Sequence, residues 1–136
     1  MNLFIDSDIL LDALLLRHPH DSFAMEILSL TDSADFELYS SAHSLLDVYY
    51  FTSKIAGKIA AKKSLSLLEQ KLNIVPTAKA SIKSGLVSNF TDFEDAVQYA
   101  MALENNCQVI ITRNIKDYIK SNIAVMTAEQ YLKSLG

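Results

Sequence analysis

The sequence has 136 residues, of which 50% are hydrophobic, and its formal net charge is −4. A chain of this length can bury roughly two-thirds of its unfolded surface, so we expect one domain spanning residues 1–136. The negative charge argues against a protein that holds nucleic acid through a general positive field. Any contact with nucleic acid therefore needs a local basic surface or a metal ion.

The chain contains no run of about eighteen apolar residues, so no membrane span is predicted. The N-terminus has no basic region followed by a cleavage site, and we expect no secretion signal. Cys107 is the single cysteine and cannot form an internal disulfide, which is typical of a cytoplasmic protein. The sequence thus predicts a cytoplasmic protein without membrane contact.

Short apolar runs alternate with longer segments of helical periodicity along the whole chain. In chain order we expect a strand at 2–6, helices at 8–16 and 21–31, a strand at 36–40, helices at 42–56 and 58–71, a strand at 73–75, helices at 78–87 and 91–104, strands at 109–112 and 123–126, and a terminal helix. This alternation predicts parallel βαβ units. The expected fold is an α/β class, three-layer α/β/α sandwich with a central, mostly parallel sheet of four to five strands.

Two helix starts carry the pattern of a capping box, in which a threonine is followed three residues later by glutamate or glutamine. The first pair is Thr91 with Glu94, and the second is Thr127 with Gln130. Between them, residues 109–112 (VIIT) form a continuous β-branched run, as expected for a strand buried on both faces. These signals define the expected helices and strands after residue 91 more sharply than those in the middle of the chain.

Aspartates follow the expected strands at the places where the strands end. Asp6 ends the first strand, Asp8 follows it, and Asp117 follows the strand that ends at residue 112. Asp92 and Asp95 lie three residues apart in one first helical turn, where the helix N-terminus favours anions. Ligands of open α/β sheets bind beyond the carboxyl ends of the strands. We therefore expect a cluster of carboxylates at one edge of the sheet.

Two further aspartates lie inside expected helices. Asp47, in the segment SLLDVYYF, has apolar neighbours and is expected near the core or facing a cleft, whereas Asp12 is expected to be a solvated helix position. Converging carboxylates repel one another and either raise their pKa values or bind a cation. An all-oxygen set favours Mg²⁺ or Mn²⁺, which can activate water against a phosphodiester. This is the chemistry of a metal-dependent nuclease.

Four segments in this order resemble the motifs of the PIN domain family: FIDSDILLD, SLLDVYYF, DFEDAVQYAMALENNC and VIITRNIKDY. The resemblance covers almost the whole chain and implies a Mg²⁺- or Mn²⁺-dependent endoribonuclease. It is strongest for the small single-domain members that are toxins of toxin–antitoxin pairs. By position, the four acids of the family fall on Asp6, Asp47, Asp95 and Asp117, as catalytic and metal-binding residues.

The resemblance also implies supporting roles for Thr112 and Asn114 beside the fourth acid. The chain departs from the family at Asp47, where a glutamate is usual, and at Asp8, where many members have a neutral polar residue. Because aspartate is one methylene shorter, we expect Asp47 to reach the metal directly or through water. We interpret Asp8 as a supporting carboxylate.

Basic residues that could contact RNA phosphates fall into two groups. Arg113 and Lys116 adjoin the last motif, and Lys54 and Lys58 belong to a helical stripe of lysines. The expected partners are therefore an RNA substrate and an antitoxin protein. The apolar content and the small size also favour a homodimer.

Two alternatives remain open at this stage. The D-x-D pattern of Asp6 and Asp8 also fits a haloacid dehalogenase-type phosphohydrolase, although the expected second acidic pair is absent from VIITRNIKDY. The other alternative is a catalytically degenerate PIN-fold binding module, in which Asp47 marks the lost activity. Loss of biological effect on replacing Asp95 would distinguish an enzyme from such a module.

Overall fold

The computed structural model describes residues 1–136 and has a parallel five-stranded sheet in the order β3-β2-β1-β4-β5. The strands are β1 (Asn2–Ile5), β2 (Glu37–Ser41), β3 (Asn73–Val75), β4 (Val109–Ile111) and β5 (Ala124–Met126). β1 is central, since it pairs with β2 on one side and with β4 on the other. The predicted α/β fold and its parallel sheet are confirmed.

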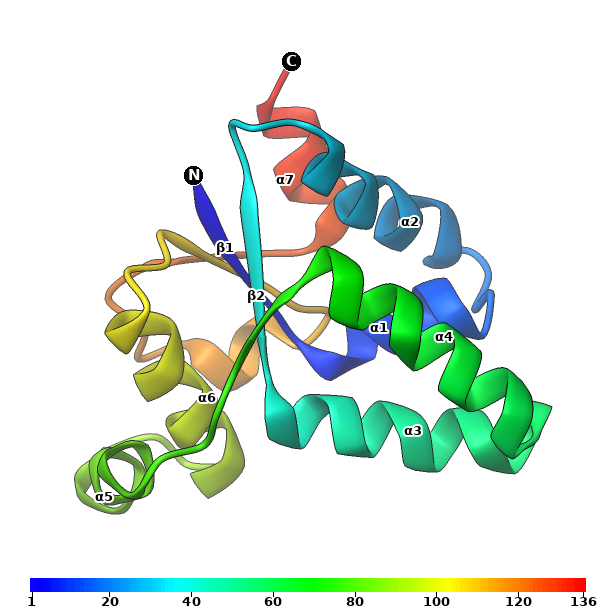
Figure 1. Ribbon diagram of the computed structural model, residues 1–136. Coiled ribbons are helices and arrows are strands. Elements are labelled where there is room, and N and C mark those ends of the chain that lie inside the picture. Colours follow the sequence, from blue (N-terminus) through cyan, green and yellow to red (C-terminus); the bar gives the residue numbers. More distant parts are fainter.

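Helices cover both faces of this sheet (Figure 1). They are α1 (Ser7–Leu14), α2 (Asp21–Ser29), α3 (Ala42–Ala56), α4 (Lys58–Lys71), α5 (Lys79–Val87), α6 (Phe93–Glu104) and α7 (Ala128–Ser134), with short 3-10 turns η1 (Leu30–Asp32) and η2 (Ile115–Tyr118). Five of them, α1 to α4 and α7, pack on one face and α6 on the other, with α5 against α6. The three-layer arrangement is thus confirmed as well.

Alternation along β1 divides the core into two clusters. Leu3 and Ile5 belong to the larger cluster beneath α1 to α4 and α7, whereas Phe4 belongs to the smaller one beneath α6. All three side chains are at most 1% exposed. A strand buried on both faces reads as a continuous apolar run, which is why β1 shows no polar alternation in the sequence. The strand then ends at Asp6, in the carboxyl edge of the sheet.

Two sequence-based expectations are wrong in detail. The N-cap of α6 is Asp92 rather than Thr91, and the Asp92 side chain accepts a hydrogen bond from the backbone N–H of Glu94. Asp12, expected to be solvated, is completely buried beneath Arg113. The capping box of Thr127 with Gln130 is present as predicted.

A close approach of α5 and α6 depends on Gly85. A Cβ at this position would lie 2.6 Å from Cγ2 of Val97, inside van der Waals contact. The two helices therefore pack backbone against side chain here, and Val97 also lines a pocket described below. None of the helices combines the length and the apolar character needed to cross a membrane.

Candidate active site at the carboxyl edge of the sheet

Asp6 lies between the end of β1 and the start of α1, and its two carboxylate oxygens accept from different segments. Oδ1 accepts from the backbone N–H of Ser7 at 2.7 Å, as an N-cap does. Oδ2 accepts from Oγ1 of Thr112 at 2.9 Å and from the hydroxyl of Tyr118 at 3.3 Å. Burial raises the pKa of Asp6, while the hydrogen bonds from Thr112, Ser7 and Tyr118 oppose that rise. The Asp6 carboxylate therefore caps α1 and also contacts the segment that follows β4.

Asp8 lies in the first turn of α1 and faces the loop that follows β4. Its Oδ2 accepts from the backbone N–H of Arg113 at 3.1 Å, with Oγ1 of Thr112 at 3.4 Å and Nδ2 of Asn114 at 3.5 Å. Its Oδ1 is buried without any hydrogen-bond partner. Burial, followed by the charge of Asp6, raises the pKa of Asp8 to about 7. An unpaired oxygen of this kind is available to a cation.

Asp95 and Asp117 bring carboxylates from two further segments. Asp95 is half-buried in the first turn of α6, and Asp117 is exposed on η2. Burial is the largest cause that raises the pKa of Asp95 to about 7, and the charges of Asp92, Asp6 and Asp117 contribute to this rise in that order. The charges of Asp6 and Asp117 therefore reach Asp95, although the three residues are far apart in the sequence.

Asp47 faces His43 and Glu94 rather than the hydrogen-bonded core of the site. Nε2 of His43 lies 3.4 Å from Oδ2 of Asp47 and 4.0 Å from Oε2 of Glu94. Burial raises the pKa of Glu94, and the charges of Asp47, Asp92 and Asp6 add to that rise against the opposing effect of His43. Glu94 thus stands between the acid on α3 and the acid at the end of β1.

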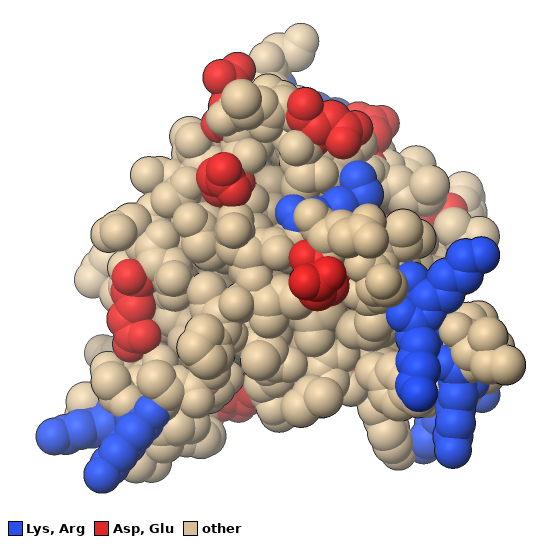
Figure 2. All heavy atoms as spheres, in the orientation of Figure 1, with Lys and Arg blue, Asp and Glu red and all other residues tan.

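The four predicted basic residues occupy different places. Nε of Arg113 lies 2.9 Å from Oδ2 of the buried Asp12, and Lys116 is exposed on η2 beside Asp117. Lys54 is in the last turn of α3, with Nζ 4.2 Å from the ring centroid of Tyr50, and Lys58 begins α4. Figure 2 shows basic side chains gathered over this α3–α4 turn. Only Arg113 and Lys116 accompany the acidic residues.

Sequence reasoning missed several residues that the fold brings to the site. The Tyr118 hydroxyl contacts Asp6 directly, although its only sequence signal is the position immediately after Asp117. His43 precedes Asp47 by one helical turn, a spacing that places two side chains on one face. Glu94 was visible only as part of a helix start, and nothing in the sequence pairs it with His43.

The donor set fits a hard divalent cation. The site offers carboxylates from β1, α1, α3, α6 and η2, and one of their oxygens, Oδ1 of Asp8, is buried without a partner. Hard cations such as Mg²⁺ and Mn²⁺ prefer such oxygen ligands. His43, Asp47 and Glu94 also place one ligand atom each within 4.8 Å of one another. The residues present therefore have the donor chemistry that a divalent ion requires.

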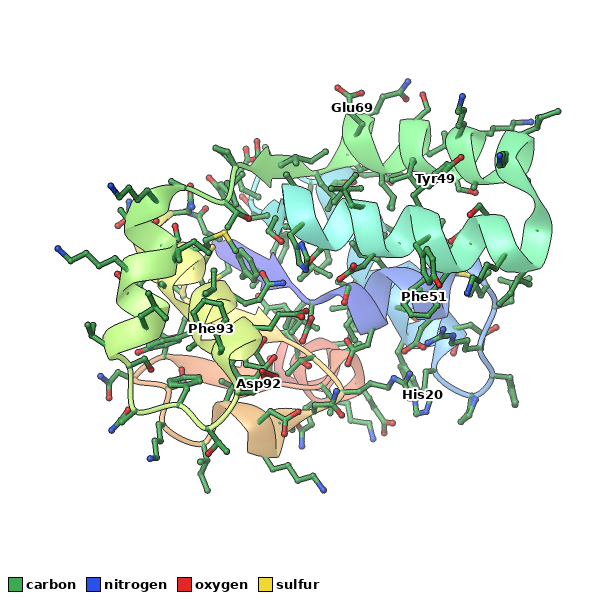
Figure 3. All side chains as sticks on the ribbon, turned by 90° about the horizontal axis from the view of Figure 1, so that it is seen from below. His20, Tyr49, Phe51, Glu69, Asp92 and Phe93 are labelled. Carbon is green, nitrogen blue, oxygen red and sulfur yellow. The ribbon has the colours of Figure 1, made fainter.

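Pockets lie on both sides of the acidic residues. One, of about 320 Å³, is lined by Arg113 and Asn114 together with residues of α1, α2 and α7. The other, of about 220 Å³, lies between α5, α6 and the start of α3, and Glu94 lines it. Figure 3 labels Asp92 and Phe93 at the start of α6, on the side of the second pocket.

Residues 2–116 match the sequence profile described as PIN domain. The chain belongs to the PIN domain family. The match includes every motif on which the resemblance was based except the end of the last one. Membership in this family rules out the haloacid dehalogenase-type alternative, since the fold and the motif order are those of a PIN domain.

Among proteins similar to this PIN domain is Ribonuclease VapC1 from Aquifex aeolicus (strain VF5). It is 28% identical over 136 residues, covering 94% of this chain and 91% of that protein. Among solved structures, a toxin–antitoxin complex from Klebsiella pneumoniae has a TM-score of 0.70 at 21% identity, covering 93% of this chain and 97% of that one.

A second similar structure is VapBC-1 from nontypeable Haemophilus influenzae, with a TM-score of 0.68 at 16% identity and coverage of 95% and 99% of the two chains. At these identities the structural likeness shows the fold of the PIN domain. The relation to VapC1 extends over nearly the full length of both proteins.

Proposed function

We propose that this protein is an endoribonuclease that depends on Mg²⁺ or Mn²⁺ and acts as the toxin of a toxin–antitoxin pair. One observation carries the proposal: at the carboxyl edge of the sheet Asp6 and Asp8 both contact the Thr112 hydroxyl, and the charges of Asp6 and Asp117 raise the pKa of Asp95. Full-length similarity to a ribonuclease supports the substrate class. The activity is hydrolysis of an RNA phosphodiester at this edge of the sheet.

In this proposal Asp6, Asp95 and Asp117 hold the divalent ion directly, and Asp47 holds it directly or through water. The bound ion supplies an activated water and neutralises charge on the phosphate. The remaining residues position the ligands. Thr112 and Tyr118 fix one oxygen of Asp6, and Thr112 and Asn114 direct the side chain of Asp8 toward the same centre.

Lys116 is the basic residue best placed to meet an RNA phosphate. It is exposed on η2 next to Asp117, whereas the guanidinium of Arg113 is already paired with Asp12. Lys54 and Lys58 lie near the opposite end of α3 from Asp47, roughly 10 Å or more along the helix axis. They can contact only a more distant part of an RNA strand.

An antitoxin protein is the proposed partner, and a second copy of the chain is a further candidate. Similar folds occur in the toxin–antitoxin complex from Klebsiella pneumoniae. On this chain, apolar side chains are exposed along α3 and into α4, namely Leu46, Tyr50, Phe51, Ile55 and Ile59. Contiguous exposed apolar side chains mark protein contacts. The lone buried thiol of Cys107 fits a cytoplasmic location.

The decisive experiment is cleavage of a panel of labelled RNAs in Mg²⁺, in Mn²⁺ and in chelator. We expect metal-dependent cuts by the wild type and their loss in Asp6→Asn, which keeps a side chain able to cap α1. Asp35→Asn, an exposed position away from the site, is the matched control. Unchanged cutting by Asp6→Asn would contradict the proposed site. Absence of cutting by well-folded, metal-loaded protein would favour the degenerate binding module.

A further inference from the structure

The pocket between α5, α6 and the start of α3 has apolar walls and a polar rim. Ile82 from α5 and Val97 and Met101 from α6 form much of its wall. Its volume of about 220 Å³ is below the ~300–1,000 Å³ of pockets that take drug-sized ligands. A pocket of this size and character suits a single flat ring system, such as one nucleobase.

Gln98 gives this pocket a buried polar group without a partner. The residue is 3% exposed, and its Nε2 donates to Oγ of Ser44 at 2.9 Å. Its Oε1 is buried and accepts no hydrogen bond. A buried carbonyl oxygen without a hydrogen bond is unfavourable, so a ligand that donates to it is favoured. Gln98 therefore points to a ligand that carries an N–H group.

The other polar groups of the pocket include His43, whose Nε2 lies 3.4 Å from Oδ2 of Asp47 and 4.0 Å from Oε2 of Glu94, and two residues that offer acceptors. Glu94 lies one turn before Gln98 on α6 and adds a carboxylate to the rim, where its side chain is 56% exposed. Thr77 donates its hydroxyl proton to Sδ of Met101 at 3.6 Å, which leaves its oxygen free to accept. The pocket thus presents several acceptors around an apolar interior.

We propose that this pocket binds a guanine base of the RNA strand that is cleaved at the acidic site. Guanine is the base that presents two adjacent donors, N1–H and the N2 amino group, on its Watson–Crick edge, and single-stranded RNA is read on these edges. Adenine and cytosine place one amino donor beside an acceptor, which would face the carboxylate of Glu94. Uracil places one N–H between two acceptors.

The pocket adjoins the acidic residues through consecutive positions of α6. Glu94 lines the pocket, and the next residue, Asp95, belongs to the site. Phe93 precedes them, lines the same pocket and is 46% exposed, so its ring is available for stacking on a base (Figure 3). A nucleotide with its base in the pocket therefore carries its phosphate toward the carboxylates. This inference rests on the proposed ribonuclease function and adds a base preference to it.

A binding measurement tests the pocket without any cleavage. In metal-free protein, guanosine titrated into the labelled chain should shift the NMR signals of the Gln98 side-chain amide and of Phe93. Inosine, which lacks the N2 amino group, should bind at least about fivefold more weakly, and adenosine at least about tenfold, since a lost bidentate pair has an effect of this order. Equal binding of all three, or shifts that map elsewhere, would overturn the proposal.

Two tryptophan substitutions on α5, one inside the pocket and one outside it, provide matched variants. Ile82→Trp places a large ring in the pocket from a position that is already 36% exposed, and it should abolish guanosine binding. Leu86→Trp lies one turn further along α5, is 70% exposed and is outside the pocket, so it should bind guanosine like the wild type. Retained binding in Ile82→Trp would also overturn the proposal.

The consequence for RNA is measured separately. Two RNAs that differ only by guanine or adenine beside one cleavage site should be cut at rates that differ at least tenfold by the wild type and by Leu86→Trp. Ile82→Trp should lose that preference. Cleavage without base preference would refute the guanine pocket and leave the ribonuclease function intact. Guanosine binding in the pocket without cleavage of any RNA would refute the ribonuclease function alone.

Discussion

Nε of Arg113 lies 2.9 Å from Oδ2 of Asp12, whose carboxylate has no exposed surface. Arg17 is the only other arginine near this carboxylate, with NH1 at 3.9 Å from Oδ1. The backbone N–H of Arg113 meanwhile donates to Asp8. The Asp12–Arg113 pair therefore attaches the loop after β4 to α1, beside the acidic site.

Removal of the Arg113 guanidinium should destabilise the fold strongly. Arg113→Ala leaves the Asp12 charge buried with little compensation, and breaking such a pair costs about 3–5 kcal/mol. The partly exposed guanidinium places the expected loss near the lower end of that range. Urea unfolding measures it. The double variant Asp12→Asn, Arg113→Ala should recover part of the lost free energy of unfolding. If the effects of the two substitutions were simply additive, Asp12 and Arg113 would not interact.

The stability of the metal-free protein should fall as the pH rises. Asp8 and Asp95 have pKa values of about 7 in the folded chain, against roughly 4 when unfolded. Between these values the folded chain holds protons that the unfolded chain has released, so the free energy of unfolding decreases with rising pH and levels off above about 7. Urea unfolding in chelator at about pH 5 and about pH 8 tests this sign.

Asp95→Asn should reduce that pH dependence and stabilise the metal-free protein at about pH 8 by roughly 1 kcal/mol, after allowance for solvent screening. Asp35→Asn, on the far exposed loop, should follow the wild type. Added Mg²⁺ or Mn²⁺ should raise the stability of the wild type at this pH and should have a smaller effect on Asp95→Asn. A wild type that is more stable at about pH 8 would contradict the carboxylate repulsion.

Thr112→Val should impair cleavage while leaving the core filled. The substitution keeps the shape of a completely buried side chain and removes the hydroxyl that donates to Asp6 at 2.9 Å. A hydrogen bond to a charged group contributes about 1.5–3 kcal/mol, which corresponds to roughly a 10- to 150-fold loss of kcat/KM if it acts fully on the reaction.

The same substitution should raise the pKa of Asp6, because the Thr112 hydrogen bond lowers it. The acidic limb of the pH–rate profile should therefore move to higher pH. Thr52→Val is a matched control, since Thr52 is also buried but lies on α3 with a hydroxyl that has no partner. An unchanged pH–rate profile in Thr112→Val would show that the Thr112 hydrogen bond does not affect the cleavage reaction.

Asp47→Glu should increase metal affinity. Asp47 is directed toward His43, and an added methylene extends its carboxylate toward the centre of the site. We expect the concentration of Mn²⁺ needed for half-maximal cleavage to fall several-fold in Asp47→Glu, and to rise by about tenfold or more in Asp47→Ala, as loss of one ligand implies. Equal metal affinity in all three proteins would exclude Asp47 as a ligand.

The sequence predicted the parts of the site that depend on local pattern. Asp6 follows a run of apolar residues that can only be a buried strand, and Asp95 follows a recognisable helix start. Because parallel strands share a carboxyl edge, their approximate convergence followed from the fold class alone. The capping box at Thr127 could also be predicted, since all of its atoms come from four consecutive residues.

Features that depend on residues distant in the sequence could not be predicted from the sequence. Asp12 was expected in solvent because the sequence around it gives no sign of its partner Arg113, which is about one hundred residues away along the chain. At the start of α6, Thr91 and Asp92 are both good caps, and only the backbone conformation decides between them. The role of Tyr118 depends on a loop geometry that no periodicity encodes.

The central position of β1 has a consequence for the order of synthesis. The first strand to leave the ribosome finds its second neighbour only when β4, residues 109–111, has followed. Thr112 and Tyr118 are synthesised later still, so an unfinished chain carries Asp6 without the two hydroxyl groups that donate to its carboxylate. In the proposed ribonuclease, the acidic site is therefore complete only after residues 109–118 have been synthesised and have packed beside β1.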